Sequence, residues 1–482
     1  MTEQIGIAAT FILFLLIFTG VGIYSSKKKE TTTTDYLLAS RNVNTWLTAL
    51  SAMATGQSGL LFIGQVGFTY KIGISSLWLV IGWLIGDYIA WYFVFTKLRQ
   101  VSEETASDTI SSFLNHNNQG SRLVAIISAL ITIAFLGSYA AAQLVAGSKA
   151  ISAVFGWNYY LGIVVGAAIV VTYCFSGGIR ASIWTDAVQA IIMIVSLFTL
   201  FITAVNSCGG FGSLWQSLGN INPSLIDWNS SQQPWGFLPF FIGWIVAGFG
   251  VVGQPHIIIR AMAIDSAKHI NFARNIKISL GILNSISAIG IGLAARVLMP
   301  DLINSGDPEL ALPYLSLELL PAVVVGLIVA GLFSATISTA DSQILACSAA
   351  ITQDLFPGLA QSYKFVKLGT LIVTTVILVI ALAGSDNVFS LVTFSWSALA
   401  SGLGPLLILK VWQRTISTLT AISMMGVGIA TALIWNLGLN LSSAIYEVLP
   451  GMASGMIVYG FDQLLRNTHL SGFCLSILKR KG

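Results

Sequence analysis

Long apolar runs separated by short polar connections are the dominant pattern of this sequence. A bilayer core about 30 Å thick is crossed by about 20 apolar residues in a helix, and a helix satisfies its own backbone hydrogen bonds there. The runs predict thirteen transmembrane helices, at about 5–24, 45–68, 74–95, 123–155, 159–176, 184–205, 235–258, 278–298, 321–351, 366–384, 388–409, 416–437 and 443–464.

Composition supports a polytopic membrane protein and excludes other classes. Of the 482 residues, 55% are apolar and only 9% are charged, whereas soluble domains carry about a quarter charged residues. The net charge of +4 is not gathered into a basic stripe of the kind that binds nucleic acid. The four His and four Cys are dispersed, without metal-binding or disulfide spacing. Nothing in the sequence supports an enzyme.

The distribution of basic residues predicts the orientation of these helices. Cytoplasmic connections are enriched in Lys and Arg. With the N-terminus outside and the C-terminus inside, all of the 23 basic residues except Lys71, Lys149 and Arg296 fall in inward segments. The two longest outward connections, 206–234 and 299–320, contain neither Lys nor Arg. A miscounted helix would reverse this pattern for every later connection.

Two of the predicted helices are interrupted by polar residues and glycines. The second run contains the sequence TGQSG at residues 55–59, and the seventh contains four glycines followed by Gln254 and Pro255. Such sequence favours unwound segments that line a cavity, although small residues also serve close helix packing. The two helices run in opposite directions in the predicted topology. This arrangement is typical of an inverted repeat with a binding site at the midplane of the membrane.

The ninth run concentrates oxygen-bearing side chains within about two helical turns. Ser338 and Ser342 lie one turn apart on one face, with Thr339 and Asp341 beside them. Hydroxyl and carbonyl oxygens suit a hard cation such as Na⁺. Ser and Thr hydroxyls in membrane helices also bond back to their own backbone, whereas an aspartate inside the membrane indicates a functional site.

The order of several motifs resembles the sodium/solute symporter family, and within it the bacterial sodium/proline symporters. These motifs are DYLLASRNVNTWLTALSAMATGQSG, FSGGIRASIWTDAVQA, GQPHIIIRAMA and SATISTADSQILACSAAITQDLF. The resemblance implies one all-α transporter domain with a LeuT-like core of two inverted five-helix repeats. An extra N-terminal helix at 5–24 would precede repeat one at about 45–205 and repeat two at about 235–409, and two C-terminal helices would occupy about 416–464.

The resemblance also implies cation sites. The principal Na⁺ site of the family maps onto Ala54, Gln57, Ala335, Ser338 and Thr339. Some members bind another Na⁺ beside it, and the corresponding positions here are Asp186, Ser338, Asp341 and Ser342. Asp341 stands where a hydroxyl residue is usual. One Na⁺ is therefore expected, and a second cation or a proton at Asp341 is left open as an alternative.

The solute pocket departs from that of the proline transporters. Gly56 replaces an aspartate, and Ala247 and Val251 stand where the family presents aromatic residues. A second alignment pairs Gly243 and Trp244 with the family's GW and requires a short insertion. The resemblance assigns solute binding to Ser58, Gly59, Tyr139, Gln143, Phe249, Val251, Gln254 and Pro255.

These observations predict a secondary active symporter of the cell (inner) membrane. We expect it to couple Na⁺ to uptake of a small solute. The solute is expected to be neutral or zwitterionic, because the predicted pocket contains no basic residue to bind a net anion. Proline or a related amino acid is the first choice. Proton coupling in the same fold and a symporter-like solute sensor are the alternatives. The predicted partners are the solute and the lipid bilayer, with no nucleic acid and no obligate protein partner.

Overall fold

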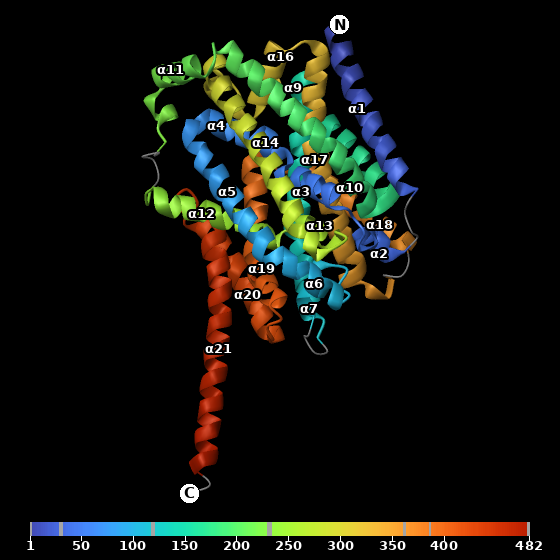
Figure 1. Cartoon of the computed structure of the whole chain (residues 1–482), viewed down its shortest axis with the longest axis vertical. Coiled ribbons are helices and arrows are strands. Elements are labelled where there is room, and N and C mark those ends of the chain that lie inside the picture. The colour runs from blue at the N-terminus through green and yellow to red at the C-terminus, as the bar shows by residue number, and fades with distance from the viewer. Residues whose placement is uncertain are drawn as a thin grey trace.

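The computed structural model describes residues 2–27, 32–116, 121–228, 234–359, 363–384 and 387–479. These residues are helical almost throughout, and their one isolated β-bridge joins Val43 to Ile264 (Figure 1). The basic residues at positions 28, 29, 480 and 481 lie outside the described residues, as does the 229–233 part of one predicted outward connection. The all-α fold predicted from the sequence is therefore confirmed.

The α-helices of the described residues comprise long ones, which overlap the predicted runs, and short ones, which lie between them. They are α1 (Thr2–Ser26), α2 (Thr33–Leu38), α3 (Thr45–Gly59), α4 (Val66–Ile72), α5 (Leu77–Ala90), α6 (Thr96–Glu104), α7 (Ile110–Asn115), α8 (Leu123–Ile131), α9 (Gly137–Phe155), α10 (Tyr159–Ser207), α11 (Phe211–Ile221), α12 (Phe237–Phe249), α13 (Pro255–Ala263), α14 (Ile270–Leu298), α15 (Leu302–Ser305), α16 (Ala311–Leu319), α17 (Ala322–Ala349), α18 (Tyr363–Ala383), α19 (Val388–Val411), α20 (Thr418–Leu433) and α21 (Val448–Lys479).

Short 3₁₀ and π segments join or extend these helices. They are η1 (Ala39–Arg41), η2 (Leu60–Gln65), η3 (Gly73–Ser76), η4 (Trp91–Phe95), η5 (Thr132–Leu136), η6 (Pro223–Ile226), η7 (Gly250–Gly253), η8 (Ala267–His269), η9 (Pro308–Leu310), η10 (Ala350–Leu355), η11 (Pro357–Leu359) and η12 (Ile434–Gly438).

In the described part of the chain, nine helical stretches are long and apolar enough to cross a membrane. The bent pair α12 and α13 adds a tenth if the two helices together form one span. One of the nine, Thr45–Glu104, covers two of the predicted runs. The chain turns inside it at Gly73, whose φ is 75°. The apolar helix at Tyr159–Thr172 is shorter than each of these stretches. The number thirteen and the orientation in the membrane therefore stay predictions.

The predicted runs 159–176 and 184–205 both lie within α10, which comprises two helical stretches that meet at Gly178. The break at Gly178 falls inside the connection expected at 177–183, and the helical conformation resumes directly after it. Gly178 has φ 59° and ψ −147°, a conformation that glycine adopts without a steric penalty. A Cβ at this position would lie 2.5 Å from the Tyr36 carbonyl oxygen. A single glycine therefore turns the chain, and the polar residues after it begin the next helical segment.

The centre of the protein is α17, which is buried from Ile328 to its end at Ala349. It packs against α10, α9, α1 and α3. Small residues permit the close approach: a Cβ on Gly331 would lie 2.0 Å from the Ser196 hydroxyl of α10. Small residues at helix contacts are typical of membrane proteins, where packing replaces the hydrophobic driving force. The hydroxyl-rich helix is thus held on several sides by its neighbours.

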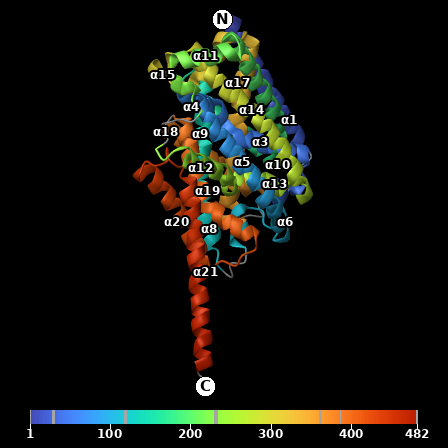
Figure 2. The same ribbon diagram turned by 60° about the vertical axis from the view of Figure 1, so that its left-hand side comes forward.

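The two ends of the bundle differ in the segments that they carry. The N-terminus lies at the same end as α11 and α16, and α6 and α7 lie at the opposite end (Figure 1). Helix α21 extends beyond the rest of the bundle toward the C-terminus (Figure 2). The two predicted outward connections therefore share an end with the N-terminus, as the topology requires.

Candidate functional site

Helix α3 breaks at Ser58, within the segment that the sequence singled out. Ser58 has φ 52° and ψ −175°, so the regular helix stops there and a π segment, η2, follows. The Gly59 N–H donates to Gln143 Oε1 at 2.8 Å, whereas in a regular helix it would donate to the Thr55 carbonyl. Tyr139 donates its hydroxyl to Ser58 Oγ at 3.3 Å. The predicted interruption of this helix is confirmed.

The Thr55 carbonyl finds its partner on the hydroxyl-rich helix instead. Thr339 Oγ1 donates to the Thr55 carbonyl at 3.1 Å and to the Ala335 carbonyl at 3.0 Å. Ser338 Oγ donates to the same Ala335 carbonyl at 3.2 Å. Carbonyl and hydroxyl oxygens of α3 and α17 thus gather where α3 loses its regular bonding. The chemistry of these oxygens fits a dehydrated monovalent cation.

The residues predicted to bind Na⁺ are partly brought together. Ala335, Ser338 and Thr339 share one face of α17, and Ala54 is buried on α3 directly before Thr55. The Gln57 side chain reaches α14, where its Nε2 donates to the Gly281 carbonyl at 3.1 Å. No contact between Gln57 and α17 is among the described interactions. The assignment of these five residues as Na⁺ ligands stays a prediction.

The second predicted interruption, in the seventh run, is also confirmed. Helices α12 and α13 meet at an angle of 61°, across η7 and the extended residue Gln254. Pro255 has no N–H to donate, and it disfavours a helical conformation at the residue before it. Gln254 Nε2 donates to the Trp396 carbonyl at 3.0 Å. A Cβ on Gly253 would lie 2.6 Å from Ala400 Cα, so α19 packs directly on the break.

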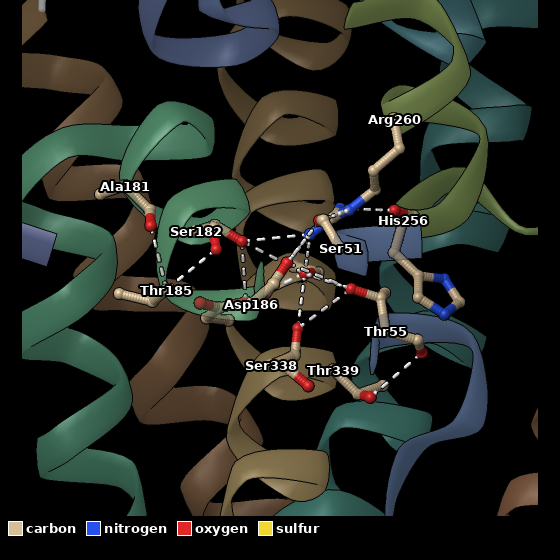
Figure 3. A network of polar contacts seen from close by, with 12 residues as sticks. Ser51, Thr55, Ala181, Ser182, Thr185, Asp186, His256, Arg260, Ser338 and Thr339 are labelled. Carbon is tan, nitrogen blue, oxygen red and sulfur yellow. Dashed lines mark hydrogen bonds and ion pairs between the residues drawn. The ribbon is translucent and has the colours of Figure 1, made fainter. Parts of the chain in front are cut away.

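A buried polar cluster lies beside the α3 and α17 contact, and Figure 3 shows most of its members. Asp186 of α10 is fully buried, and its Oδ2 accepts from Ser51 Oγ at 2.6 Å and Thr55 Oγ1 at 3.4 Å. Asp341 Oδ1 accepts from Ser182 Oγ at 3.1 Å and Ser342 Oγ at 2.9 Å. Asp186, Asp341, Ser342 and Ser338, predicted as a second cation or proton site, therefore lie together. Their role stays a prediction.

Arg260 of α13 belongs to this cluster, and the sequence reasoning did not include it. Its side chain is fully buried and forms an ion pair with Asp186 at 3.1 Å. The guanidinium also donates to Ser182 Oγ at 3.1 Å, to Ser51 Oγ at 3.2 Å and to Ser342 Oγ. In the sequence this arginine resembles any basic residue near the inner end of a helix. The one sequence signal that could have raised the question is that Arg260 follows Pro255, the end of the predicted break, by only five residues.

A cavity of about 90 Å³ lies on another side of the α3 break, between α3, α5, η7, α13, α14 and α19. Its walls are mostly apolar, and the indole rings of Trp83 and Trp396 lie next to each other there with centroids 4.5 Å apart. Gln57 and the backbone at Gly56 line it from the broken helix. An apolar pocket with a few polar groups is the usual form of a small-molecule site.

Two charged side chains line this cavity, contrary to the expectation that the pocket lacks a basic residue. Lys277 of α14 and Asp87 of α5 form an ion pair, and each is about nine-tenths buried or more. The Lys277 ammonium also lies 5.3 Å from the centre of the Trp91 ring. Among the described residues, Asp87 Oδ1 has no hydrogen-bond partner. The sequence placed Lys277 in an inward connection, directly before the run 278–298, so its pairing with Asp87 of α5 was not expected.

The residues predicted to bind the solute divide into groups. Ser58, Gly59, Tyr139 and Gln143 are joined by the hydrogen bonds at the α3 break. Of the eight predicted residues, Val251 lines the cavity. The other three lie along the α12–α13 break, and they are Phe249, Gln254 and Pro255. Pro255 borders a separate small cavity near Asp108 and Asp354. Solute binding by this set stays a prediction.

Comparison with known proteins identifies relatives along nearly the whole chain. The family model described as the sodium:solute symporter family matches residues 36–428. The osmoregulated proline transporter of Bacillus subtilis (strain 168) is 32% identical over 495 residues, covering 99% of each chain. The high-affinity proline transporter of the same strain is 31% identical over 453 residues, covering 92% of this chain and 94% of the relative.

The fold has a counterpart among solved structures. A Na⁺-coupled sialic acid symporter in a substrate-bound, outward-open state superposes with a TM-score of 0.77 at 18% sequence identity. The match covers 95% of this chain and 98% of the symporter. At this identity the likeness shows the fold alone.

Proposed function

This chain belongs to the sodium:solute symporter family, and we propose that it couples Na⁺ entry to the import of a small zwitterionic solute across the cell membrane. Proline or a related amino acid is the first candidate, because the two proline transporters above are similar over more than nine-tenths of their lengths. The Na⁺-coupled symporter of the same fold supports Na⁺ as the coupling ion.

The observation that carries the proposal for the solute is the Lys277–Asp87 pair in the cavity. A zwitterion presents one carboxylate and one ammonium, and it can insert into such a pair without adding net charge to the membrane interior. Lys277 would take the carboxylate, and the unpartnered oxygen of Asp87 would take the ammonium. Trp83 and Trp396 would cover the apolar part of the solute.

Gly56 leaves room for this arrangement. A Cβ at this position would lie 3.8 Å from Lys277 Cε and 3.8 Å from Ile257 Cδ1. An acidic side chain here would meet Lys277, and the resemblance places an aspartate at this position in proline transporters. In this chain Lys277 pairs with Asp87 instead. We infer that this chain binds the same zwitterionic charge as those transporters through a differently placed acidic residue.

Na⁺ and solute would communicate through the broken helices. The oxygens proposed for Na⁺ and the backbone facing the cavity belong to the same break in α3. A cation held between α3 and α17 fixes the position of that break, and the break forms one wall of the cavity. The coupling is reciprocal, so each ligand raises the affinity for the other by the same factor. A membrane potential of about 100 mV supplies about 2.3 kcal/mol per charge moved.

Proton coupling is the second candidate, because Asp186 and Asp341 are both buried within one cluster. It predicts solute uptake driven by a pH gradient in the absence of Na⁺. The oxygen-rich contact between Thr339 and the Thr55 carbonyl favours Na⁺.

Uptake by the purified protein in proteoliposomes tests the proposal. A panel of proline, other amino acids, betaines and sugars is supplied with an inward gradient of Na⁺, K⁺ or choline at constant pH. We expect accumulation of a zwitterion only with Na⁺. Lys277→Met should abolish it, and Lys268→Met, which changes an exposed lysine of η8, should not. Equal accumulation in choline medium would end the proposal.

A further inference from the structure

Arg260 occupies the centre of the buried cluster around Asp186. Its guanidinium donates to Ser51 of α3, to Ser182 and Asp186 of α10, and to Ser342 of α17. A further bond to the His256 carbonyl, at 2.5 Å, anchors it within its own helix. Figure 3 shows the side chain reaching from α13 toward Ser51, Ser182 and Asp186. Three other helices thus present oxygen atoms to one positive group.

The oxygens around this guanidinium are the kind that bind a hard cation. Besides the His256 carbonyl oxygen, they comprise one carboxylate oxygen and three hydroxyl oxygens. Oxygen-only sets of this kind suit Na⁺ and similar ions. The same hydroxyls of Ser182 and Ser342 also bond to Asp341. Without Arg260 the cluster would hold two buried carboxylates and no basic group from the residues described here.

We propose that Arg260 is a built-in cation that takes the place of a second Na⁺ in this cluster. A metal ion there would need the oxygens that the guanidinium already contacts. Arginine keeps its charge at every physiological pH, and two cations at hydrogen-bond distance repel strongly away from water. The transporter then couples a single Na⁺, held at the α3–α17 contact, to each solute. This inference rests on the proposed Na⁺ symport and adds its stoichiometry.

The place of Arg260 in the fold gives the arrangement a second consequence. Arg260 lies on α13, the half-helix that follows the break at Gln254, whereas its oxygen partners lie on α3, α10 and α17. The ion pair with Asp186 therefore holds the second half of a broken helix against three packed helices. A free metal ion at the same oxygens would leave α13 without this connection.

The test counts ions at equilibrium in the purified full-length protein. Binding of ²²Na⁺ in detergent, against K⁺, should saturate at about one ion per chain in the wild type, with a Hill coefficient of about one. Arg260→Gln removes the charge, and it should raise both values toward about two, because two carboxylates and three hydroxyls become available. Arg260→Lys keeps the charge and should stay at about one. In the double variant with Asp186→Asn and Arg260→Gln, the loss of the Asp186 carboxylate should return the number of bound Na⁺ ions to about one per chain.

A measurement on the wild type alone keeps the proposal open to refutation if Arg260→Gln does not fold. The current carried per zwitterionic solute in proteoliposomes should be about one positive charge. A ratio of about two, or a folded Arg260→Gln that still binds about one Na⁺, would overturn the role of Arg260 as a built-in cation. Absence of any Na⁺ binding and of Na⁺-driven uptake in the wild type would instead refute the proposed function.

Discussion

Replacing Thr339 by valine tests the proposed Na⁺ site most directly. The side chain is fully buried on α17, and valine has nearly the same shape. The change removes one hydroxyl, which donates to the Thr55 carbonyl at 3.1 Å and to the Ala335 carbonyl at 3.0 Å. We expect the protein to fold, because the packing volume is kept, and to bind Na⁺ more weakly, because one oxygen of the site is lost.

The size of the effect follows from the interactions of a hydroxyl with a buried charge. Hydrogen bonds to charged groups contribute about 1.5–3 kcal/mol to stability, and we take the oxygen–Na⁺ contact as comparable. Each 1.4 kcal/mol is a factor of about ten in affinity. The Na⁺ concentration for half-maximal effect should therefore rise about 10- to 100-fold. Through reciprocity, Na⁺ at a fixed low concentration should promote solute binding less in the variant.

The assay follows the melting temperature of the detergent-purified protein as Na⁺ replaces K⁺ at constant ionic strength, and repeats the titration for uptake. Thr336→Val is the matched control, because Thr336 lies on the same helix and its hydroxyl donates to the Phe333 carbonyl of that helix at 2.9 Å. It should keep wild-type Na⁺ dependence. If Thr339→Val and Thr336→Val need the same Na⁺ concentration as the wild type, Thr339 does not contact the ion.

Three further changes probe the cavity, the acidic cluster and the second break. Lys277→Met leaves Asp87 unpaired in a buried site, so solute binding should be lost while Na⁺ still raises the melting temperature. If a folded variant loses both solute binding and the effect of Na⁺ on the melting temperature, the role of Lys277 is not confined to the solute. Asp341→Asn removes a negative charge one turn or less from Ser338, and Na⁺ affinity should fall severalfold; an unchanged Na⁺ titration would return Asp341 to a structural role. Gly253→Ala forces a Cβ to 2.6 Å from the α19 backbone and should cost about 1–3 kcal/mol in thermal or denaturant unfolding, whereas Gly212→Ala, which meets nothing within 4 Å, should cost far less.

Much of the architecture could be predicted from local properties of the sequence. Helices form where about 20 apolar residues follow one another, because the backbone has no other partner in lipid. Breaks were predicted at residues 55–59 and around Gln254 and Pro255, and the structure has them at Ser58 and at η7. Glycine, proline and polar side chains disturb a helix wherever they occur, so these positions needed no knowledge of the neighbours. The connection predicted at 177–183 also contains a break, at Gly178, although a single residue is enough to turn the chain there.

The chemistry around the breaks could be predicted only in part. Ser338, Thr339, Asp341 and Ser342 drew notice because polar residues are rare in a buried helix. The partners that they meet come from helices distant in the chain, and Arg260 and Ser182 were not among the predicted residues. An arginine near the end of a helix is usually solvated, so its sequence position carried no sign of burial.

Sequence alone determined that this chain is a bundle of membrane helices, that two of them are interrupted, and that it is a symporter by family. These properties depend on hydrophobicity, on residues that disturb a helix wherever they stand, and on motifs read in order along the chain. Tertiary structure decided which charges face one another: Lys277 meets Asp87 across the cavity, and Arg260 meets Asp186 beside α17. Each pair joins residues more than seventy positions apart, so only the packing of the helices brings the opposite charges together.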